Sequence, residues 1–118
     1  MLAKYVAGDH EFDLFENIRT AIAKKDFGNY KRESLNSVPV NYLSTLDITG
    51  GNSGSPTLNG NGEFVGLVFD GVYESIIGDW DYDPKFKRAI HTSVPFMLWT
   101  MEQIDGAGNI VDEMTIVK

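Results

Sequence analysis

The stretch that decides the fold runs from Asp47 to Gly71 and reads DITGGNSGSPTLNGNGEFVGLVFDG. Its first part is rich in glycine and surrounds one serine, Ser53. In its second part, apolar and β-branched residues flank Asn-Gly steps, which accept the positive φ angles of tight hairpin turns. We therefore expect a loop that presents Ser53, followed by a β-hairpin over residues 55–70.

The segments on either side of this stretch predict further strands and helices. Residues 40–48 and 88–94 are rich in β-branched and aromatic residues, which favour strands. Residues 13–25 carry apolar side chains at helical spacing. Pro95 is followed by an apolar run to residue 104, which is typical of a helix with proline in its first turn. The fold class that follows is mainly β with flanking helices.

Composition limits what the chain can do. With 118 residues, of which 42% are hydrophobic, one domain with an ordinary core is expected. The net charge of −7 disfavours nucleic acid as a partner, because no basic excess can displace counterions from phosphates. The absence of cysteine excludes disulfides, thiolate zinc sites and a cysteine nucleophile. No segment predicts a signal peptide, a membrane span or a membrane-surface helix, so no membrane partner is expected.

Ser53 is the candidate nucleophile. A serine attacks a carbonyl well when it stands clear of its strand, a base takes its proton and N–H groups face the developing oxyanion. Gly51 and Gly54 give the backbone the freedom to present Ser53, and the N–H groups of Gly51 and Ser53 are the candidate oxyanion donors. The alternative is a glycine-rich turn without chemistry. A hydrolase nucleophile elbow fits poorly, because Ser55 stands where its last glycine should be.

The string GNSGSP, with the hairpin, strand and helix predicted after it, resembles the nucleophile motif of trypsin-like serine peptidases. Over residues 5–108 the chain more narrowly resembles the C-terminal region of the bacterial dipeptidyl-peptidase 7/11 family, which are serine exopeptidases. This resemblance implies a partial chymotrypsin-like β-barrel over residues 37–108. Residues 1–36 would then be a helical lead-in, and residues 109–118 a tail.

The same resemblance implies that the base lies elsewhere. His10 sits in a polar segment near the N-terminus, and His91 sits in the middle of a predicted strand, where a packed imidazole is expected. The family carries its catalytic histidine and aspartate upstream, in motifs that this chain does not contain. We therefore expect a fragment that is inactive alone, acts on peptides, and partners with the remainder of the same protease. Self-association into a homo-oligomer and a periplasmic or cell-surface location are also expected.

Three residues at the end of the hairpin are candidates for substrate binding: Phe69, Asp70 and Gly71. In the resembled fold this strand lines the substrate cleft, and the resemblance assigns Asp70 to the N-terminal ammonium of the substrate. A turn-capping aspartate is the alternative from the residues alone. At the position of Gly71 the family pairs arginine with acidic substrates and glycine with bulky apolar ones, which implies a hydrophobic preference. Alternatively, Gly71 merely bends the strand.

No metal or cofactor is expected. Asp79, Asp81 and Asp83 imitate the start of a calcium loop, but Pro84 and Ile90 replace the glycine and the glutamate that such a loop needs. Two other functions stay open: a trypsin-like endopeptidase of the glutamyl type, which shares GNSGSP, and a non-catalytic, protease-like interaction module. Asp70 favours the exopeptidase, because an endopeptidase has no free amine to bind.

Overall fold

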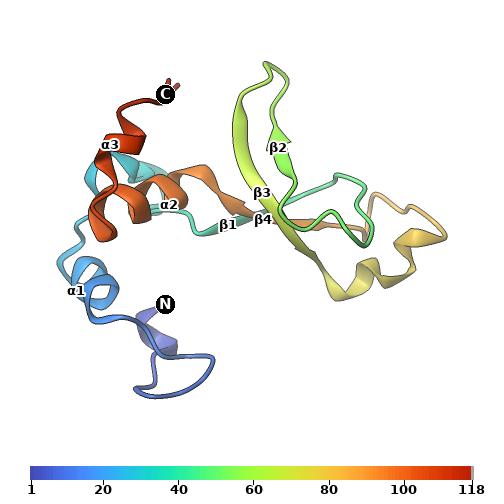
Figure 1. Cartoon of the computed structure of the whole chain (residues 1–118). Helices are drawn as coiled ribbons and strands as arrows, with labels where there is room; N and C mark the ends of the chain where they lie inside the picture. Colours follow the sequence, from blue (N-terminus) through green and yellow to red (C-terminus); the bar gives the residue numbers. More distant parts are fainter. Residues whose placement is uncertain (118) are drawn as a thin grey trace. The chain divides into compact units, whose positions relative to one another are not determined.

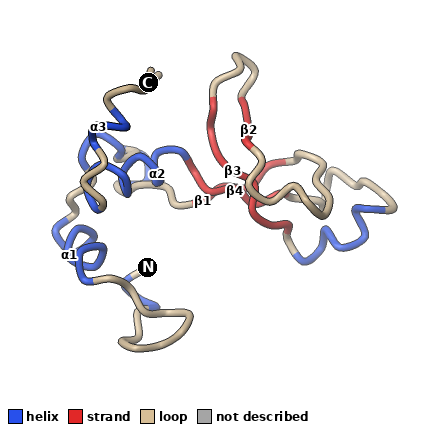
Figure 2. Tube along the Cα trace, viewed as in Figure 1, coloured by secondary structure: helices blue, strands red, loops and turns tan. Residues whose placement is uncertain are grey.

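The structure is a computed structural model that describes residues 1–117, except for the side chains of residues 77–79. The chain forms two compact units (Figures 1 and 2). One unit combines Met1–Val38 with Leu98–Thr115 and is helical. The other contains Pro39–Met97 and the C-terminal end, and it holds the sheet. The predicted boundaries at residues 36/37 and 108/109 stay a prediction.

The second unit is built on one antiparallel sheet of four strands, in the order β1-β4-β3-β2 (Figure 2). The strands are β1 Asn41–Ser44, β2 Pro56–Leu58, β3 Phe64–Gly71 and β4 Ala89–Ser93. The predicted hairpin is thus present as β2 and β3. The strand expected over residues 40–48 ends early, because its partner β4 begins at Ala89, directly opposite Ser44. Between β3 and β4 the chain forms a 3-10 helix at Tyr73–Asp79.

A buried histidine on the inner strand β4 connects three strands of the sheet through hydrogen bonds. His91 is 0% exposed, and both ring nitrogens are paired: Nε2 lies 2.6 Å from Ser44 Oγ, and Nδ1 lies 2.8 Å from Thr57 Oγ1. A hydroxyl can donate or accept, so the two partners satisfy either tautomer of the neutral ring. Burial lowers the pKa of His91, which favours that neutral form. The expectation of a packed imidazole is confirmed.

The ring of Tyr42 on β1 covers this histidine. The two rings stack with centroids 4.7 Å apart and planes 9° from parallel. Tyr42 also crosses over Gly66 on β3, where an added Cβ would meet the phenol oxygen at 2.6 Å. Only glycine lets the Tyr42 ring approach β3 so closely. Burial raises the pKa of the Tyr42 phenol.

The helical unit has its own small core. Its helices are α1 Glu16–Lys24, the end of α2 Val94–Trp99, a π-helical turn at Thr100–Ile104, and α3 Gly108–Val111. Trp99 is buried, and its indole N–H donates to the carbonyl of Asp26 at 2.8 Å. The Tyr30 hydroxyl donates to Glu102, and burial together with this bond raises the pKa of Tyr30 to about 12.

Two details of this unit differ from the sequence analysis. The helix predicted over residues 13–25 begins only at Glu16, so Phe15 precedes α1 as its N-cap residue and is 80% exposed. The segment predicted as a tail, residues 109–118, includes most of the short helix α3. Among the described residues, no helix has the length and apolar character needed to cross a membrane.

The pairing of His91 with Thr57 predicts the effect of a substitution. Thr57→Val keeps the side-chain shape but removes the hydroxyl, and leaving a buried polar group without its partner costs about 1–3 kcal/mol. Hydrogen–deuterium exchange of the β4 amides in the protein that contains this chain should show opening that is easier by that amount. Thr115→Val, at an exposed position, is the matched control and should leave exchange unchanged. Equal protection of β4 in Thr57→Val and wild type would contradict the role given to this bond.

Candidate active site

Ser53 lies in a tight loop between β1 and β2. Asn52 closes the loop, because its side-chain Oδ1 accepts the N–H of Thr49 at 2.8 Å and its main-chain carbonyl accepts the N–H of Ser55 at 2.9 Å. Gly51 and Gly54 have φ angles of +94° and +86°, which side chains with a Cβ rarely adopt. The glycines of GGNSG are therefore needed by the backbone that surrounds Ser53.

The loop is fastened to β3 directly after Ser53. Gly54 N–H donates to the carbonyl of Val68 at 2.7 Å, and Val68 N–H donates to the carbonyl of Ser55 at 3.0 Å. Past Val68 the register between β3 and β4 shifts by one residue, so Phe69 forms a β-bulge. A bulge bends a strand and re-aims the side chains that follow it. Here it directs the end of β3 past the exposed Ser53, whose Oγ lies 3.4 Å from the carbonyl of Phe69.

The backbone N–H groups of this loop fall into two sets. Those of Asn52, Gly54 and Ser55 donate to carbonyls of the protein. Within the described part of the chain, those of Gly51 and Ser53 donate to no protein acceptor. These are the two groups that the sequence analysis named as oxyanion donors. They remain available to an acceptor outside the protein.

A hollow of about 280 Å³ lies beside this loop. The loop that carries Ser53 forms one wall from Ile48 to Ser53, and the end of β3 from Val68 to Val72 forms another. The structure thus gathers around one pocket all five residues that the sequence singles out: Gly51, Ser53, Phe69, Asp70 and Gly71.

Asp70 and Gly71 lie at the end of β3 in this pocket. Asp70 is exposed, and its Oδ1 accepts the N–H of Gly71 at 2.8 Å. A Cβ built on Gly71 would lie 3.7 Å from the side chain of Ser75 and 4.0 Å from that of Ile48, in ordinary contact. Both neighbours line the pocket, so any side chain at position 71 would begin inside it.

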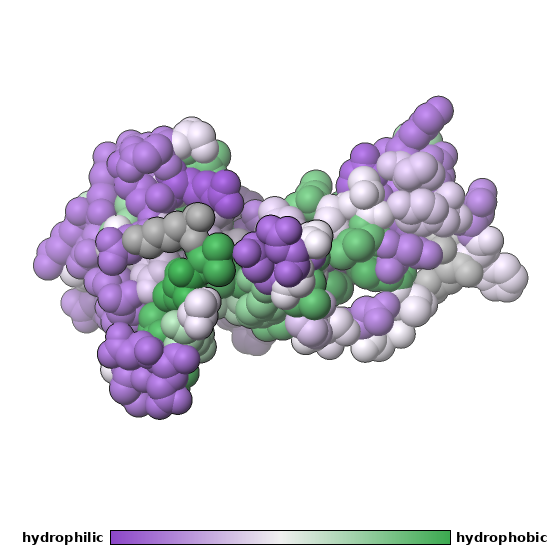
Figure 3. Space-filling view, turned by 90° about the horizontal axis from the view of Figure 1, so that it is seen from above, coloured by the Kyte–Doolittle hydropathy of each residue, from purple (hydrophilic) through white to green (hydrophobic). Residues whose placement is uncertain are grey.

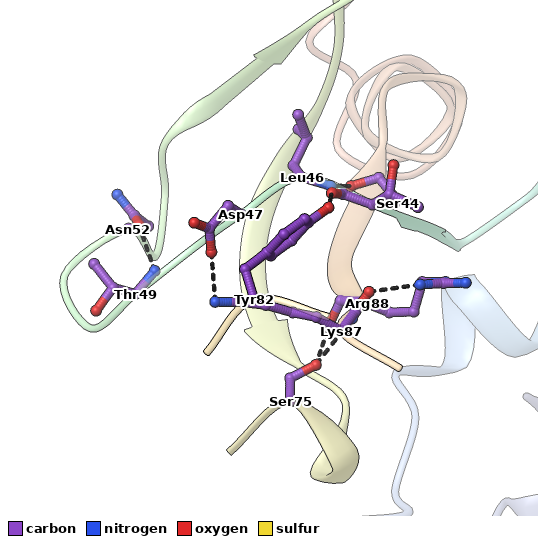
Figure 4. A network of polar contacts seen from close by, with 10 residues as sticks. Ser44, Leu46, Asp47, Thr49, Asn52, Ser75, Tyr82, Lys87 and Arg88 are labelled. Atoms are coloured by element: carbon purple, nitrogen blue, oxygen red, sulfur yellow. Dashed lines mark hydrogen bonds and ion pairs between the residues drawn. The ribbon is translucent and has the colours of Figure 1, made fainter. Parts of the chain in front are cut away.

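Sequence reasoning missed a charged residue of the pocket, Lys87. This lysine is buried, lines the pocket and pairs with Asp47 across 2.5 Å (Figure 4). The two residues are forty positions apart in the chain, and neither belongs to a motif. Nothing in the sequence distinguishes a lysine that is buried next to a strand from a lysine that is exposed to solvent.

The histidines are not paired with Ser53. Both ring nitrogens of His91 are engaged by Ser44 and Thr57. His10 is exposed in a turn of the helical unit. Within the described residues no cluster of histidine, aspartate or glutamate could hold a metal ion, and the side chain of Asp79 lies outside them.

The known proteins that this chain is similar to include several dipeptidyl-peptidases. The chain is 46% identical over 118 residues to dipeptidyl-peptidase 7 of Capnocytophaga gingivalis and 43% identical to an Asp/Glu-specific dipeptidyl-peptidase of the same organism. Each alignment covers 100% of this chain and 16% of the relative. The crystal structure of Porphyromonas endodontalis DPP11 in complex with the dipeptide Arg-Asp matches with a TM-score of 0.89 and 31% identity. That match covers 95% of this chain and 16% of the other.

The chain therefore corresponds to a region of larger dipeptidyl-peptidases and spans about 16% of their length. The four-stranded sheet and its helices match the corresponding region of DPP11. The family model of peptidase S46 matches residues 1–116. The resemblance seen in the GNSGSP stretch is thus confirmed at the level of the family, and the chain belongs to the peptidase S46 family.

Proposed function

We propose that this chain supplies the serine nucleophile and the substrate-binding strand of a serine dipeptidyl-peptidase. The enzyme releases dipeptides from the free N-terminus of peptides, with a preference for an apolar second residue. One observation carries the proposal: a single pocket is lined by the exposed Ser53, by Gly51 and by the end of β3 at Asp70 and Gly71.

The chemistry begins at Ser53. Its Oγ attacks the carbonyl carbon of the second substrate residue, and a base accepts the hydroxyl proton. The N–H groups of Gly51 and Ser53, which bond to nothing in the described chain, donate to the oxyanion that forms. The peptide amine then leaves with a proton, and water releases the dipeptide from the acylated serine.

The base and its carboxylate belong to another part of the enzyme. The ring nitrogens of His91 bond to two hydroxyls, and burial favours its neutral form. We therefore assign His91 a structural role in the sheet. The relatives are far longer than this chain, which leaves room for a second barrel that carries the catalytic histidine and aspartate. In this proposal the sheet is the C-terminal piece of a chymotrypsin-like barrel, and the isolated chain is inactive.

Asp70 is the proposed anchor for the substrate ammonium. Its carboxylate is exposed, lines the same pocket as Ser53, and uses one oxygen to accept the N–H of Gly71. A fixed carboxylate at a set distance from the nucleophile selects a free N-terminus and fixes how many residues reach the serine. This explains dipeptide release better than cleavage within a chain, which the glutamyl-type endopeptidase alternative would require.

Gly71 supports the apolar preference. A side chain at this position would start between Ile48 and Ser75 and fill the pocket. Glycine leaves that space open and adds no charge, which suits a bulky apolar substrate side chain. The names of the relatives include both dipeptidyl-peptidase 7 and Asp/Glu-specific enzymes, so the preference rests on Gly71 itself.

Large apolar residues at the surface of the sheet unit support a partner for this region: Leu43, Leu58 and Phe64 are all exposed. Figure 3 shows apolar surface in green among hydrophilic surface in purple. We assign the surface formed by Leu43, Leu58 and Phe64 to contact with the remainder of the same protease. We also propose that the enzyme forms a homo-oligomer. A periplasmic or cell-surface location is part of the proposal and follows from the family resemblance.

Ser53 gives the first test. In the whole enzyme, Ser53→Ala should abolish labelling by a fluorophosphonate probe and lower kcat on dipeptidyl substrates by on the order of 10⁶-fold. Ser55→Ala, the same change two residues later, is the matched control and should keep both. Activity or labelling that persists in Ser53→Ala would exclude this serine as the nucleophile. A wild-type enzyme that shows neither labelling nor dipeptide release would favour the non-catalytic interaction module.

Asp70 gives the second test. Asp70→Asn removes a charge-assisted contact worth about 1.5–3 kcal/mol, so kcat/KM for dipeptide release should fall about tenfold to hundredfold. Labelling of Ser53 by a small fluorophosphonate, which has no amine, should stay at the wild-type rate. Unchanged dipeptide release would refute the anchor and favour an endopeptidase. An equal loss of labelling would mean that Asp70 supports the loop instead.

A further inference from the structure

A buried lysine in the substrate pocket needs an explanation. Lys87 lies just before β4, its side chain is 4% exposed, and it lines the pocket that holds Ser53 and Gly71. Taking an ammonium out of water is costly unless an opposite charge and further polar contacts compensate it. Packing alone does not offset this desolvation free energy, so we expect the charge to have a functional role.

Asp47 provides a compensating charge. Its Oδ1 lies 2.5 Å from the Nζ of Lys87, while its own side chain is 65% exposed (Figure 4). The ring of Tyr82 lies 5.9 Å from the same Nζ, and its hydroxyl donates to the carbonyl of Thr45 at 2.6 Å. The ion pair is thus held in a frame that joins the segment before the nucleophile loop to the segment before β4.

The pair determines the charge that the pocket offers to a substrate. Among its described lining residues, the pocket has one carboxylate, Asp70, and one ammonium, Lys87. Asp70 is assigned to the substrate amine. The charge of Lys87 attracts a carboxylate on the second substrate residue, and the opposite charge of Asp47 weakens that attraction.

We propose that the ion pair between Lys87 and Asp47 is a specificity determinant of this enzyme. It keeps the pocket beside Gly71 close to neutral, so that apolar side chains are preferred over acidic ones at the second substrate residue. The inference rests on the proposed dipeptidyl-peptidase function. It adds to that function that the charge of Asp47, placed against Lys87, contributes to the apolar preference at Gly71.

A purely structural role makes a different prediction. If the pair only held the nucleophile loop in place, breaking it from either side would weaken catalysis on all substrates alike. If the pair sets the charge of the pocket, removing one partner should shift the preference in one direction and removing the other should shift it in the opposite direction. The ratio of kcat/KM for two substrates separates these cases.

The experiment uses the whole enzyme and two chromogenic dipeptidyl substrates that differ only in having glutamate or leucine as the second residue. Asp47→Asn should raise the ratio of kcat/KM for glutamate over leucine about tenfold, because a charged contact is worth at least that much. Lys87→Met should lower the same ratio. The double variant should return it toward wild type. Asp81→Asn, which removes an exposed charge from the loop before β4, should leave it unchanged.

Fluorophosphonate labelling of Ser53 shows whether each variant is folded. If Asp47→Asn fails to label, Lys87→Met alone still tests the sign of the shift. A ratio that stays constant in every labelled variant would overturn this inference and leave the proposed function intact. A wild-type enzyme that labels but releases neither dipeptide would overturn the proposed function and this inference with it.

Discussion

The buried imidazole of His91 is the constraint on which the sheet depends. A polar ring at the centre of the sheet is tolerated because hydroxyls on two other strands, Ser44 on β1 and Thr57 on β2, satisfy both of its nitrogens. Tyr42 stacks on the ring and reaches across to Gly66. Since Thr57 is only four residues after Ser53, this network also fixes where the loop that carries Ser53 re-enters the sheet.

A second constraint is the β-bulge at Phe69, which positions the end of β3 beside the loop that carries Ser53. Pairing of the loop with β3 continues through Val68 and then stops at the bulge on Phe69. Without this extra residue, the alternation along β3 would place Asp70 and Gly71 on opposite faces from those they occupy. The bulge therefore places Asp70 and Gly71 in the pocket that Ser53 also lines, which is the pocket where we propose that the substrate binds.

The parts of the fold that the sequence predicts are those specified locally. The glycine loop, the Asn-Gly hairpin and the β-branched strands all depend on neighbouring residues, and they are present in the structure. What escaped prediction depends on distant partners. The early end of β1 is set by where β4 begins, the bulge by the register of β3 on β4, and the pair of Lys87 with Asp47 by contacts forty residues apart.

The central claim is that Ser53, Asp70 and Gly71 bind one dipeptide in a single pocket. A crystal structure of the whole enzyme inactivated by a dipeptidyl phosphonate with a free amine and a leucine-like second side chain tests it most directly. We predict a bond from Ser53 Oγ to phosphorus, the ammonium within hydrogen-bond distance of the Asp70 carboxylate, and the side chain against Gly71. Phosphorus bound to another residue, or an ammonium held away from Asp70, would contradict it.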